Sequence, residues 1–168
     1  MDFDAKISYK DMYGFNLYHS YHSSTGRLTV FIPLVVYGIA IYETITKGGS
    51  ELSRLWPYLA IVTVMIFFNP VSLYFQSKNQ IAGSPVLSDY LHYHIDDRGI
   101  EVSSSHAEEP ALLNWKGVMK VVERKTTMLV FSGKVNAYII PKDQIGDTEQ
   151  FKKLCADHLE SYRIHFKK

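Results

Sequence analysis

The chain has only one cysteine, Cys155, among its 168 residues, so no disulfide can form within it. This scarcity is typical of a reducing environment and favours a cytosolic location for any soluble part. An excess of one charge is also lacking, because 18 basic residues face 17 acidic ones for a net charge of +1. Without a chain-wide positive field, we do not expect nucleic acid as a partner.

Signatures of enzymatic chemistry are missing as well. The sequence contains no phosphate loop, dinucleotide fingerprint, zinc knuckle or nucleophile elbow. His92 and His94 alternate along one expected strand, and His19 and His22 share a helical face, but a metal site would need a third ligand to converge with either pair. Cys155 falls on the apolar side of the last helix, where a buried and unreactive thiol is expected. We therefore expect no enzyme, no catalytic residue, no metal and no cofactor.

Two long uncharged runs are present. Leu28 to Tyr42 and Leu55 to Ser77 contain no charged residue. At about 1.5 Å per residue the second run exceeds the roughly 30 Å of a bilayer core, and the first reaches it by including flanking glycine and threonine residues. The Asn69-Pro70 pair is expected to kink or end the second helix near one membrane surface. Residues 27–78 are therefore predicted to form a transmembrane helical hairpin.

The connector between the runs, residues 46–54, is short and rich in turn formers, so the two helices should be antiparallel and both termini should share one side. The basic residues are more numerous on the terminal side, which favours cytoplasmic termini. The alternative is a soluble protein with a buried helical hairpin. The rest of the chain has little mass to cover such a hairpin, and the membrane interpretation is favoured.

Residues 1–26 are predicted to form an N-terminal strand and a helix. Phe3, Ala5, Ile7 and Tyr9 alternate with polar residues, as in a half-buried strand that needs a sheet to join. Asp11 is expected to cap a helix that runs to about residue 23. That helix either lies in the membrane interface or packs on the soluble domain, and the residue types suit both equally. Residues 79–88 are expected to be a linker.

From residue 89 onward the sequence changes to short alternating strands followed by one helix. Leu91 to Ile95, the turn Asp96 to Gly99, and a return strand at Ile100 and Val102 predict a hairpin. Further strands are expected over Ala111 to Trp115, Met119 to Glu123, Met128 to Phe131 and Ala137 to Ile140. A capping motif at Asp147 to Gln150 opens a C-terminal amphipathic helix. The predicted fold class is α+β: a two-helix transmembrane hairpin plus a bent antiparallel sheet of six or seven strands, capped by this helix, in the pleckstrin-homology-like arrangement.

The order of motifs in this half resembles the YcxB-like family. Trp115 is followed by Val118 and the run Val121-Val122-Glu123, then by Tyr138-Ile139-Ile140-Pro141-Lys142 and the terminal helix, all after two membrane helices. The resemblance implies a bacterial inner (plasma) membrane protein with a cytoplasmic domain over residues 89–168 and no assigned reaction. Trp115, Tyr138 and Pro141 are expected to be structural core residues.

We expect a membrane-anchored, non-enzymatic interaction module whose domain binds an unknown protein partner or the leaflet surface. The one dense basic cluster, Lys116, Lys120, Arg124 and Lys125, is the candidate contact, although a solvated strand edge explains it equally well. The net acidic turn Asp96-Asp97-Arg98 argues against a specific inositide pocket. An alternative is a small membrane immunity or regulatory protein that blocks a toxin or transporter. The sequence specifies no oligomeric state.

Overall fold

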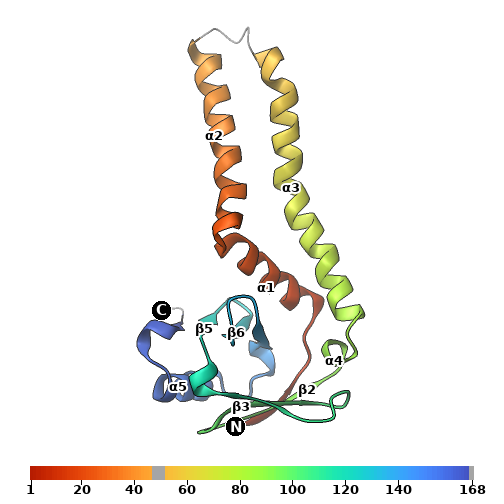
Figure 1. The fold of residues 1–168 in the computed structure, drawn as a ribbon, viewed down its shortest axis with the longest axis vertical. Coiled ribbons are helices and arrows are strands. Elements are labelled where there is room, and N and C mark those ends of the chain that lie inside the picture. The colour runs from red at the N-terminus through yellow and green to blue at the C-terminus, as the bar shows by residue number, and fades with distance from the viewer. Residues whose placement is uncertain (47–51, 167–168) are drawn as a thin grey trace. The chain divides into compact units, whose positions relative to one another are not determined.

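The computed structural model describes residues 1–46 and 52–166, and it divides into two compact units (Figure 1). One unit comprises Met1–Phe15 together with Ser77–Lys168, and the other comprises Asn16–Gln76. The first unit is therefore discontinuous in sequence. The second unit is inserted into the sequence of the first unit, between the N-terminal strand of the first unit and the remaining strands of the same sheet.

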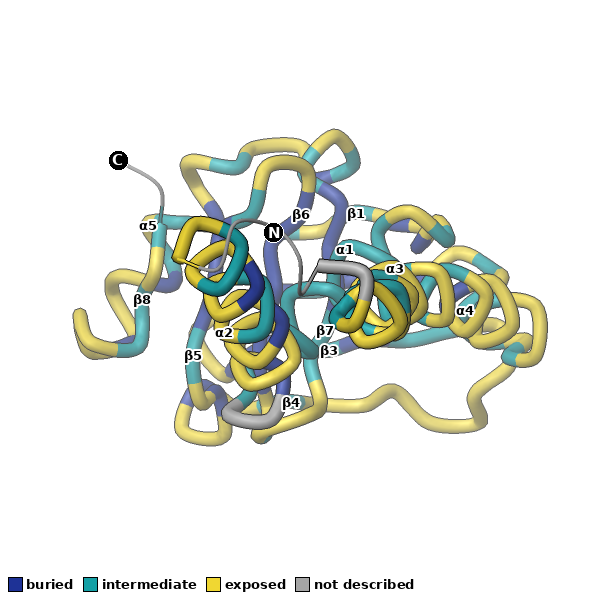
Figure 2. The backbone as a smooth tube through the Cα atoms, turned by 90° about the horizontal axis from the view of Figure 1, so that it is seen from above, coloured by how far each residue is buried: buried dark blue, intermediate teal, exposed yellow. Residues whose placement is uncertain are grey.

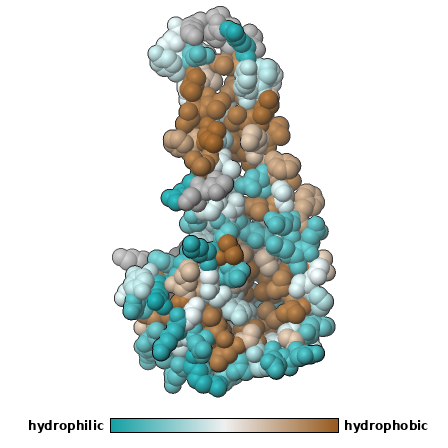
Figure 3. Space-filling view, viewed as in Figure 1, coloured by the Kyte–Doolittle hydropathy of each residue, from teal (hydrophilic) through white to brown (hydrophobic). Residues whose placement is uncertain are grey.

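Two long helices dominate the inserted segment. Helix α2 spans Ser24–Thr46 and helix α3 spans Leu52–Ala82. Stretches of 21 residues in α2 and 29 residues in α3 are long and apolar enough to cross a membrane by length and composition. Their side chains are largely exposed, and apolar side chains gather over these helices in the space-filling view (Figure 3). The prediction of two long apolar helices is confirmed.

Helix α3 continues through Asn69-Pro70 to Ala82, so of the two expected outcomes, a kink or an end of the helix, the end at this proline is excluded. The segment after residue 78 is also not an extended linker. A short helix, α4, follows over Pro85–Ser88, and the Ser84 hydroxyl caps it by accepting a hydrogen bond from the Leu87 amide. The predicted linker 79–88 is therefore mostly helical. Pro70 removes one backbone donor within α3.

Polar side chains join the helices within the inserted unit. The Tyr37 hydroxyl of α2 is hydrogen-bonded to the Thr63 hydroxyl of α3. Near the other end, the Asn69 side-chain amide donates to the Ser20 hydroxyl at 3.4 Å. Ser20 belongs to helix α1, which spans Tyr9–His22. These contacts satisfy polar groups that would otherwise face apolar surroundings.

The start of α1 differs from the prediction in its capping residue. Ser8 precedes the helix, its amide donates to the Asp11 carboxylate at 3.0 Å, and the Asp11 amide donates back to the Ser8 hydroxyl at 3.3 Å. Ser8 is thus the N-cap, and Asp11 is the residue that completes a reciprocal capping box. The cap falls earlier because the N-terminal strand ends at Ala5 and does not continue to Tyr9.

The first compact unit contains two four-stranded sheets, where a single bent sheet had been expected. The first sheet has the order β1-β2-β3-β4, with antiparallel strands Asp2–Ala5, Leu91–Asp96, Gly99–Ser104 and Ala111–Asn114. The second has the order β7-β6-β5-β8, with strands Ala137–Pro141, Thr127–Phe131, Lys120–Glu123 and Ile164–His165. A short 3-10 turn, η1 at Trp115–Gly117, interrupts the chain between β4 and β5 and separates the sheets.

Strand β8 had not been predicted, because two residues are too short for a periodic pattern. It runs parallel to β5, whereas the other strand pairs of the second sheet are antiparallel. It follows a 3-10 turn, η3, at Ser161–Arg163.

The N-terminal strand pairs with β2, so it lies directly beside a strand about ninety residues later in the chain. In this antiparallel register Ala5 lies opposite Leu91. The inserted segment therefore leaves the sheet and returns to it at neighbouring positions on the same sheet end. The helices inserted between β1 and β2 must therefore return the chain to the end of the sheet from which it left.

A C-terminal helix, α5 at Thr148–His158, completes the core. The Asp147 carboxylate caps it by accepting hydrogen bonds from the Glu149 and Gln150 amides at 3.0 and 2.9 Å, as the sequence predicts. The buried side chains come from both sheets and this helix, and they include Tyr93, Ile95, Ile100, Val121, Met128, Leu129, Val130, Phe131, Ile140, Phe151 and Cys155. In Figure 2 the buried stretches follow these strands, while α2 and α3 are mostly exposed.

Candidate functional site

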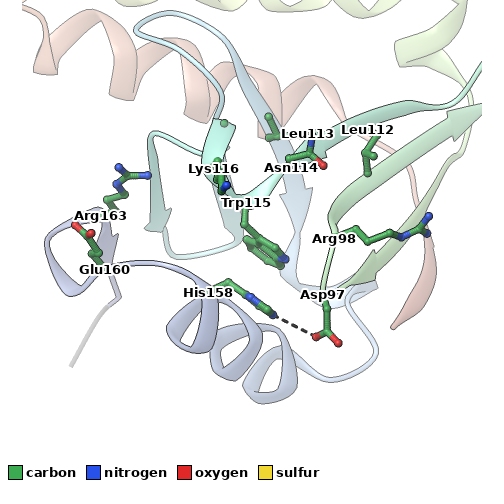
Figure 4. A pocket seen from close by; sticks show the side chains of 11 residues that line it. Asp97, Arg98, Leu112, Leu113, Asn114, Trp115, Lys116, His158, Glu160 and Arg163 are labelled. Atoms are coloured by element: carbon green, nitrogen blue, oxygen red, sulfur yellow. Dashed lines mark hydrogen bonds and ion pairs between the residues drawn. The ribbon is translucent and has the colours of Figure 1, made fainter.

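A groove of about 900 Å³ opens in the first compact unit, beside the end of the first sheet (Figure 4). Three parts of the chain form it: the turn between β2 and β3, the segment from β4 through η1, and the end of α5 with η3. The lining residues are Asp97, Arg98, Leu112, Leu113, Asn114, Trp115, Lys116, Gly117, His158, Glu160 and Arg163. The groove thus combines segments that are about sixty residues apart in sequence.

An aromatic pair forms the floor of the groove. The Trp115 indole, 6% exposed, stacks on the His158 ring with centroids 5.0 Å apart and planes inclined by 9°. The indole nitrogen donates a hydrogen bond to the Asp96 carbonyl at 2.9 Å. His158 Nε2 lies 3.3 Å from the Asp97 carboxylate (Figure 4). The indole therefore has a stacking contact with His158 and a hydrogen bond at its ring nitrogen.

Charged side chains of both signs stand around this floor. Arg98 is held by the Asp96 carboxylate, 2.8 Å from its Nε, and this hydrogen bond keeps the pKa of Asp96 below its usual range. Arg163 donates to the Val118 carbonyl at 3.2 Å. Lys116 is exposed at the rim. A mixed-charge rim over an aromatic floor suits the binding of a polar ligand such as a peptide segment.

The four basic residues that the sequence groups together lie on different elements of the structure. Lys116 belongs to η1, Lys120 begins β5, and Arg124 and Lys125 follow the end of β5. Strand β5 therefore separates Lys120 from Arg124 and Lys125, and the strand measures roughly 10 Å from Lys120 to Glu123 at about 3.3 Å per residue. Lys120 also places its ammonium group 4.6 Å from the centre of the Phe131 ring. Of the four, Lys116 is the one among the groove-lining residues.

The residues expected to be structural lie in three environments. Trp115 forms the groove floor and Pro141 is fully buried at the end of β7, whereas Tyr138 is only half-buried. Near Tyr138 lies Tyr93, whose hydroxyl is buried without a hydrogen-bond partner among the described residues. Burial raises the pKa of that phenol well above its usual value. The alternation in β2 predicts that Tyr93 faces inward, but no local pattern predicts an unsatisfied hydroxyl.

Sequence reasoning missed an ion-pair network in which two partly exposed lysines meet one buried glutamate. Glu123, the last residue of β5, is buried. Its carboxylate lies 2.5 Å from Lys142 Nζ and 3.3 Å from Lys152 Nζ. Lys142 belongs to a 3-10 turn, η2 at Lys142–Gln144, and Lys152 to α5. The only sequence signal was an acidic residue at the end of an apolar run. The network joins the second sheet to the C-terminal helix.

The histidines of β2 hold the N-terminal strand. His92 Nδ1 lies 2.6 Å from the Asp4 carboxylate, and His94 is paired in the same way with Asp2. The hydrogen bond to Asp2 raises the pKa of His94, and the same bond lowers the pKa of Asp2. Within the described ranges, no group of three or more His, Cys, Asp or Glu side chains is arranged to hold a metal ion. These side-chain contacts join β2 to β1.

Cys155 is fully buried on α5, as predicted. Burial raises the pKa of its thiol to about 12, so the reactive thiolate is scarce at neutral pH.

Comparisons with known proteins support the resemblance seen in the sequence. Residues 95–155 match the family model described as YcxB-like protein, so the resemblance is confirmed from the end of β2 into α5, a stretch that does not include α2 or α3. No curated protein matches the chain. A solved structure, mutant 1 of the MyTH4-FERM MF2 domain of Dictyostelium discoideum myosin VII, is similar over 92% of this chain at 13% identity and a TM-score of 0.35. The chain spans 35% of that protein's length, and so low a score carries no argument.

Proposed function

We propose that this YcxB-like chain is a membrane-anchored, non-enzymatic interaction module. In this proposal α2 and α3 cross the bacterial plasma membrane as a hairpin, and both termini lie in the cytoplasm. The β-rich unit is a pleckstrin-homology-like domain that binds a protein partner or the leaflet surface, with the groove above Trp115 as its binding site.

The observation that carries the proposal is the exposed apolar surface of α2 and α3. Large side chains such as Phe31, Phe67 and Phe68 are exposed along these helices. Apolar surface left in water costs about 25 cal/mol per Å², and lipid chains would remove that cost. The Tyr37–Thr63 hydrogen bond pairs two polar side chains between the helices, which a lipid environment requires.

The sheet topology supports the arrangement of the termini. The inserted helices leave and rejoin the first sheet at neighbouring strands, so a single hairpin returns the chain to one side of the bilayer. The larger number of basic residues on that side favours the cytoplasm.

The sheet topology also supports the proposed domain architecture. A four-stranded meander, a second antiparallel meander and a C-terminal helix follow one another in the order of a pleckstrin-homology-like domain.

The groove favours a protein partner over lipid. A head group of an anionic leaflet calls for basic side chains alone, whereas the groove rim carries Asp97 and Glu160 beside its basic residues. The aromatic floor also suits an apolar or aromatic anchor residue of a peptide.

Membrane topology is tested with reporter fusions. Reporters that are active only in the cytoplasm should work at both termini, and a reporter that is active only in the periplasm should work in the connector at residues 47–51. A C-terminal fusion that is active in the periplasm would refute the proposed orientation.

Binding is tested by photo-crosslinking in native membranes. A photoreactive amino acid at Lys116, on the groove rim, should give a discrete protein adduct, whereas the same group at Lys134, exposed in the β6–β7 loop, should not. A lipid adduct at position 116 would identify the leaflet as the ligand. Equal labelling at both positions would show that the groove is not a binding site.

A further inference from the structure

A second groove, the α2 groove, runs along helix α2 within the inserted unit. Its volume is about 650 Å³, which is in the range of small-molecule sites. Helix α1 contributes one residue to it and the first turns of α2 contribute the others: Tyr21, Arg27, Leu28, Val30, Phe31 and Leu34. All of them belong to the unit Asn16–Gln76, and none lines the groove above Trp115.

The α2 groove changes from charged to apolar along the helix. Arg27, Phe31 and Leu34 stand at positions i, i+4 and i+7, so they share one face of α2. Leu34 lies roughly 10 Å further along the helix axis than Arg27, at about 1.5 Å per residue. Phe31 is 62% exposed and Leu34 is 64% exposed. A ligand of this groove must therefore offer an anion at one end and an apolar chain at the other.

The charge of Arg27 has no counterion in the part of the chain that the structure describes. Its side chain is exposed, and the first turn of α2 contains no acidic residue. The acidic residue of this helix, Glu43, lies roughly 24 Å further along the axis at about 1.5 Å per residue. A guanidinium binds a phosphate through two parallel hydrogen bonds, and the Tyr21 hydroxyl is a further donor in the same groove.

The proposed membrane arrangement decides which anion reaches this groove. If α2 enters the bilayer from the cytoplasmic side, Arg27 lies at head-group level and the apolar end points toward the bilayer centre. One leaflet contributes about half of a hydrocarbon core of roughly 30 Å, so the distance from Arg27 to Leu34 stays within the cytoplasmic leaflet. A phospholipid of that leaflet has its phosphate and its acyl chains in the same order.

We infer that the α2 groove binds one anionic phospholipid of the cytoplasmic leaflet. Arg27 binds the phosphate, and an acyl chain lies along Phe31 and Leu34. A zwitterionic lipid has the same phosphate, but its own ammonium group competes with Arg27 for it. This inference rests on the proposed membrane insertion and is independent of the occupant of the groove above Trp115.

Native mass spectrometry of the full chain tests the head-group contact. The protein is released from nanodiscs that contain equal amounts of phosphatidylglycerol and phosphatidylcholine with identical acyl chains. The wild type should retain phosphatidylglycerol in preference, and Arg27→Gln should reduce the retained amount at least about fivefold. Arg27→Lys should keep most of it, because the charge remains. Arg54→Gln removes the same charge from the connector end of α3 and should match the wild type.

No preference in the wild type, or an equal loss in Arg27→Gln and Arg54→Gln, would overturn the inference.

Two further measurements test the acyl-chain contact. Phe31→Ala should reduce phosphatidylglycerol retention severalfold, whereas Phe67→Ala, which truncates a side chain of similar exposure (65%) on α3, should not. An excess of glycerol 3-phosphate, which has the phosphate without acyl chains, should leave the lipid bound. Equal effects of the two phenylalanine variants, or displacement by glycerol 3-phosphate, would show that the site does not select a lipid.

The reporter fusions that test the membrane topology distinguish the two possible failures. A chain whose helices do not cross the membrane overturns both the proposed function and the lipid site. A chain that inserts with both termini in the cytoplasm, but retains both lipids equally, overturns the lipid site alone.

Discussion

Replacement of Trp115 by alanine should reveal how strongly the groove floor stabilises the domain. The indole is almost fully buried, stacks on His158 of α5 and donates a hydrogen bond to the Asp96 carbonyl. Truncation of a buried tryptophan costs about 3–5 kcal/mol, because apolar contacts are lost and a cavity remains. Since Trp115 borders the open groove, water can enter part of that cavity, and we expect the lower end of this range, about 3 kcal/mol.

The single cysteine provides the assay. Cys155 is fully buried on α5, and its thiol pKa of about 12 keeps it protonated, so a thiol reagent reacts only after the helix opens. The labelling rate of the full-length protein then follows the free energy of opening. A loss of about 3 kcal/mol should raise the labelling rate roughly a hundredfold, because each 1.4 kcal/mol is a factor of ten.

The other tryptophan is the matched control. Trp56 lies on α3 and is 67% exposed, so Trp56→Ala should leave the labelling of Cys155 unchanged. Trp115→Phe keeps part of the packing and should fall between the wild type and Trp115→Ala. If Trp115→Ala labels at the wild-type rate, the stacked floor does not hold α5 in place and the reasoning is refuted.

Three further perturbations probe contacts that only the structure revealed. Hydrogen exchange of the β1 amides, corrected for intrinsic rates, should be slower at about pH 6 than at about pH 8.5. The raised pKa of His94 contributes stability that is fully present below the ordinary histidine pKa of 6.5 and is lost as the pH rises through the pKa of His94 in the folded protein. The lowered pKa of Asp2 contributes stability that is lost only at acidic pH. Asp2→Asn should abolish this difference. Glu123→Gln should lower the free energy of unfolding by about 1–2 kcal/mol, because two partly exposed lysine ammonium groups lose the charge of their buried partner. An unchanged melting temperature in thermal unfolding would contradict this. Gly99→Ala should cost about 2 kcal/mol or more by the same measurement, since φ is +152° and a Cβ would lie 2.2 Å from the Leu113 carbonyl oxygen, whereas a neutral effect would show that the turn relaxes freely.

Local patterns in the sequence determined several of the individual elements. The alternation of Leu91, Tyr93 and Ile95 with His92 and His94 specified both the strand and its buried face, because side chains of a strand point alternately to opposite sides. The Asp147 cap and the apolar spacing behind it specified α5. The uncharged runs specified two long helices, because apolar length is visible without any partner.

Only the tertiary structure decided how these elements combine. Pairing of β1 with β2 across the inserted helices, the division into two sheets at η1, and the convergence of two lysines on Glu123 each join residues that are far apart in the chain. Such contacts depend on the shapes and charges of surfaces that exist only after folding, so no periodic signal in the sequence encodes them. The groove also depends on contacts between residues that are far apart in the chain. Trp115 was visible in the sequence as a core residue, but the stacking on His158 and the neighbouring turn that make it the floor of a groove came from the fold.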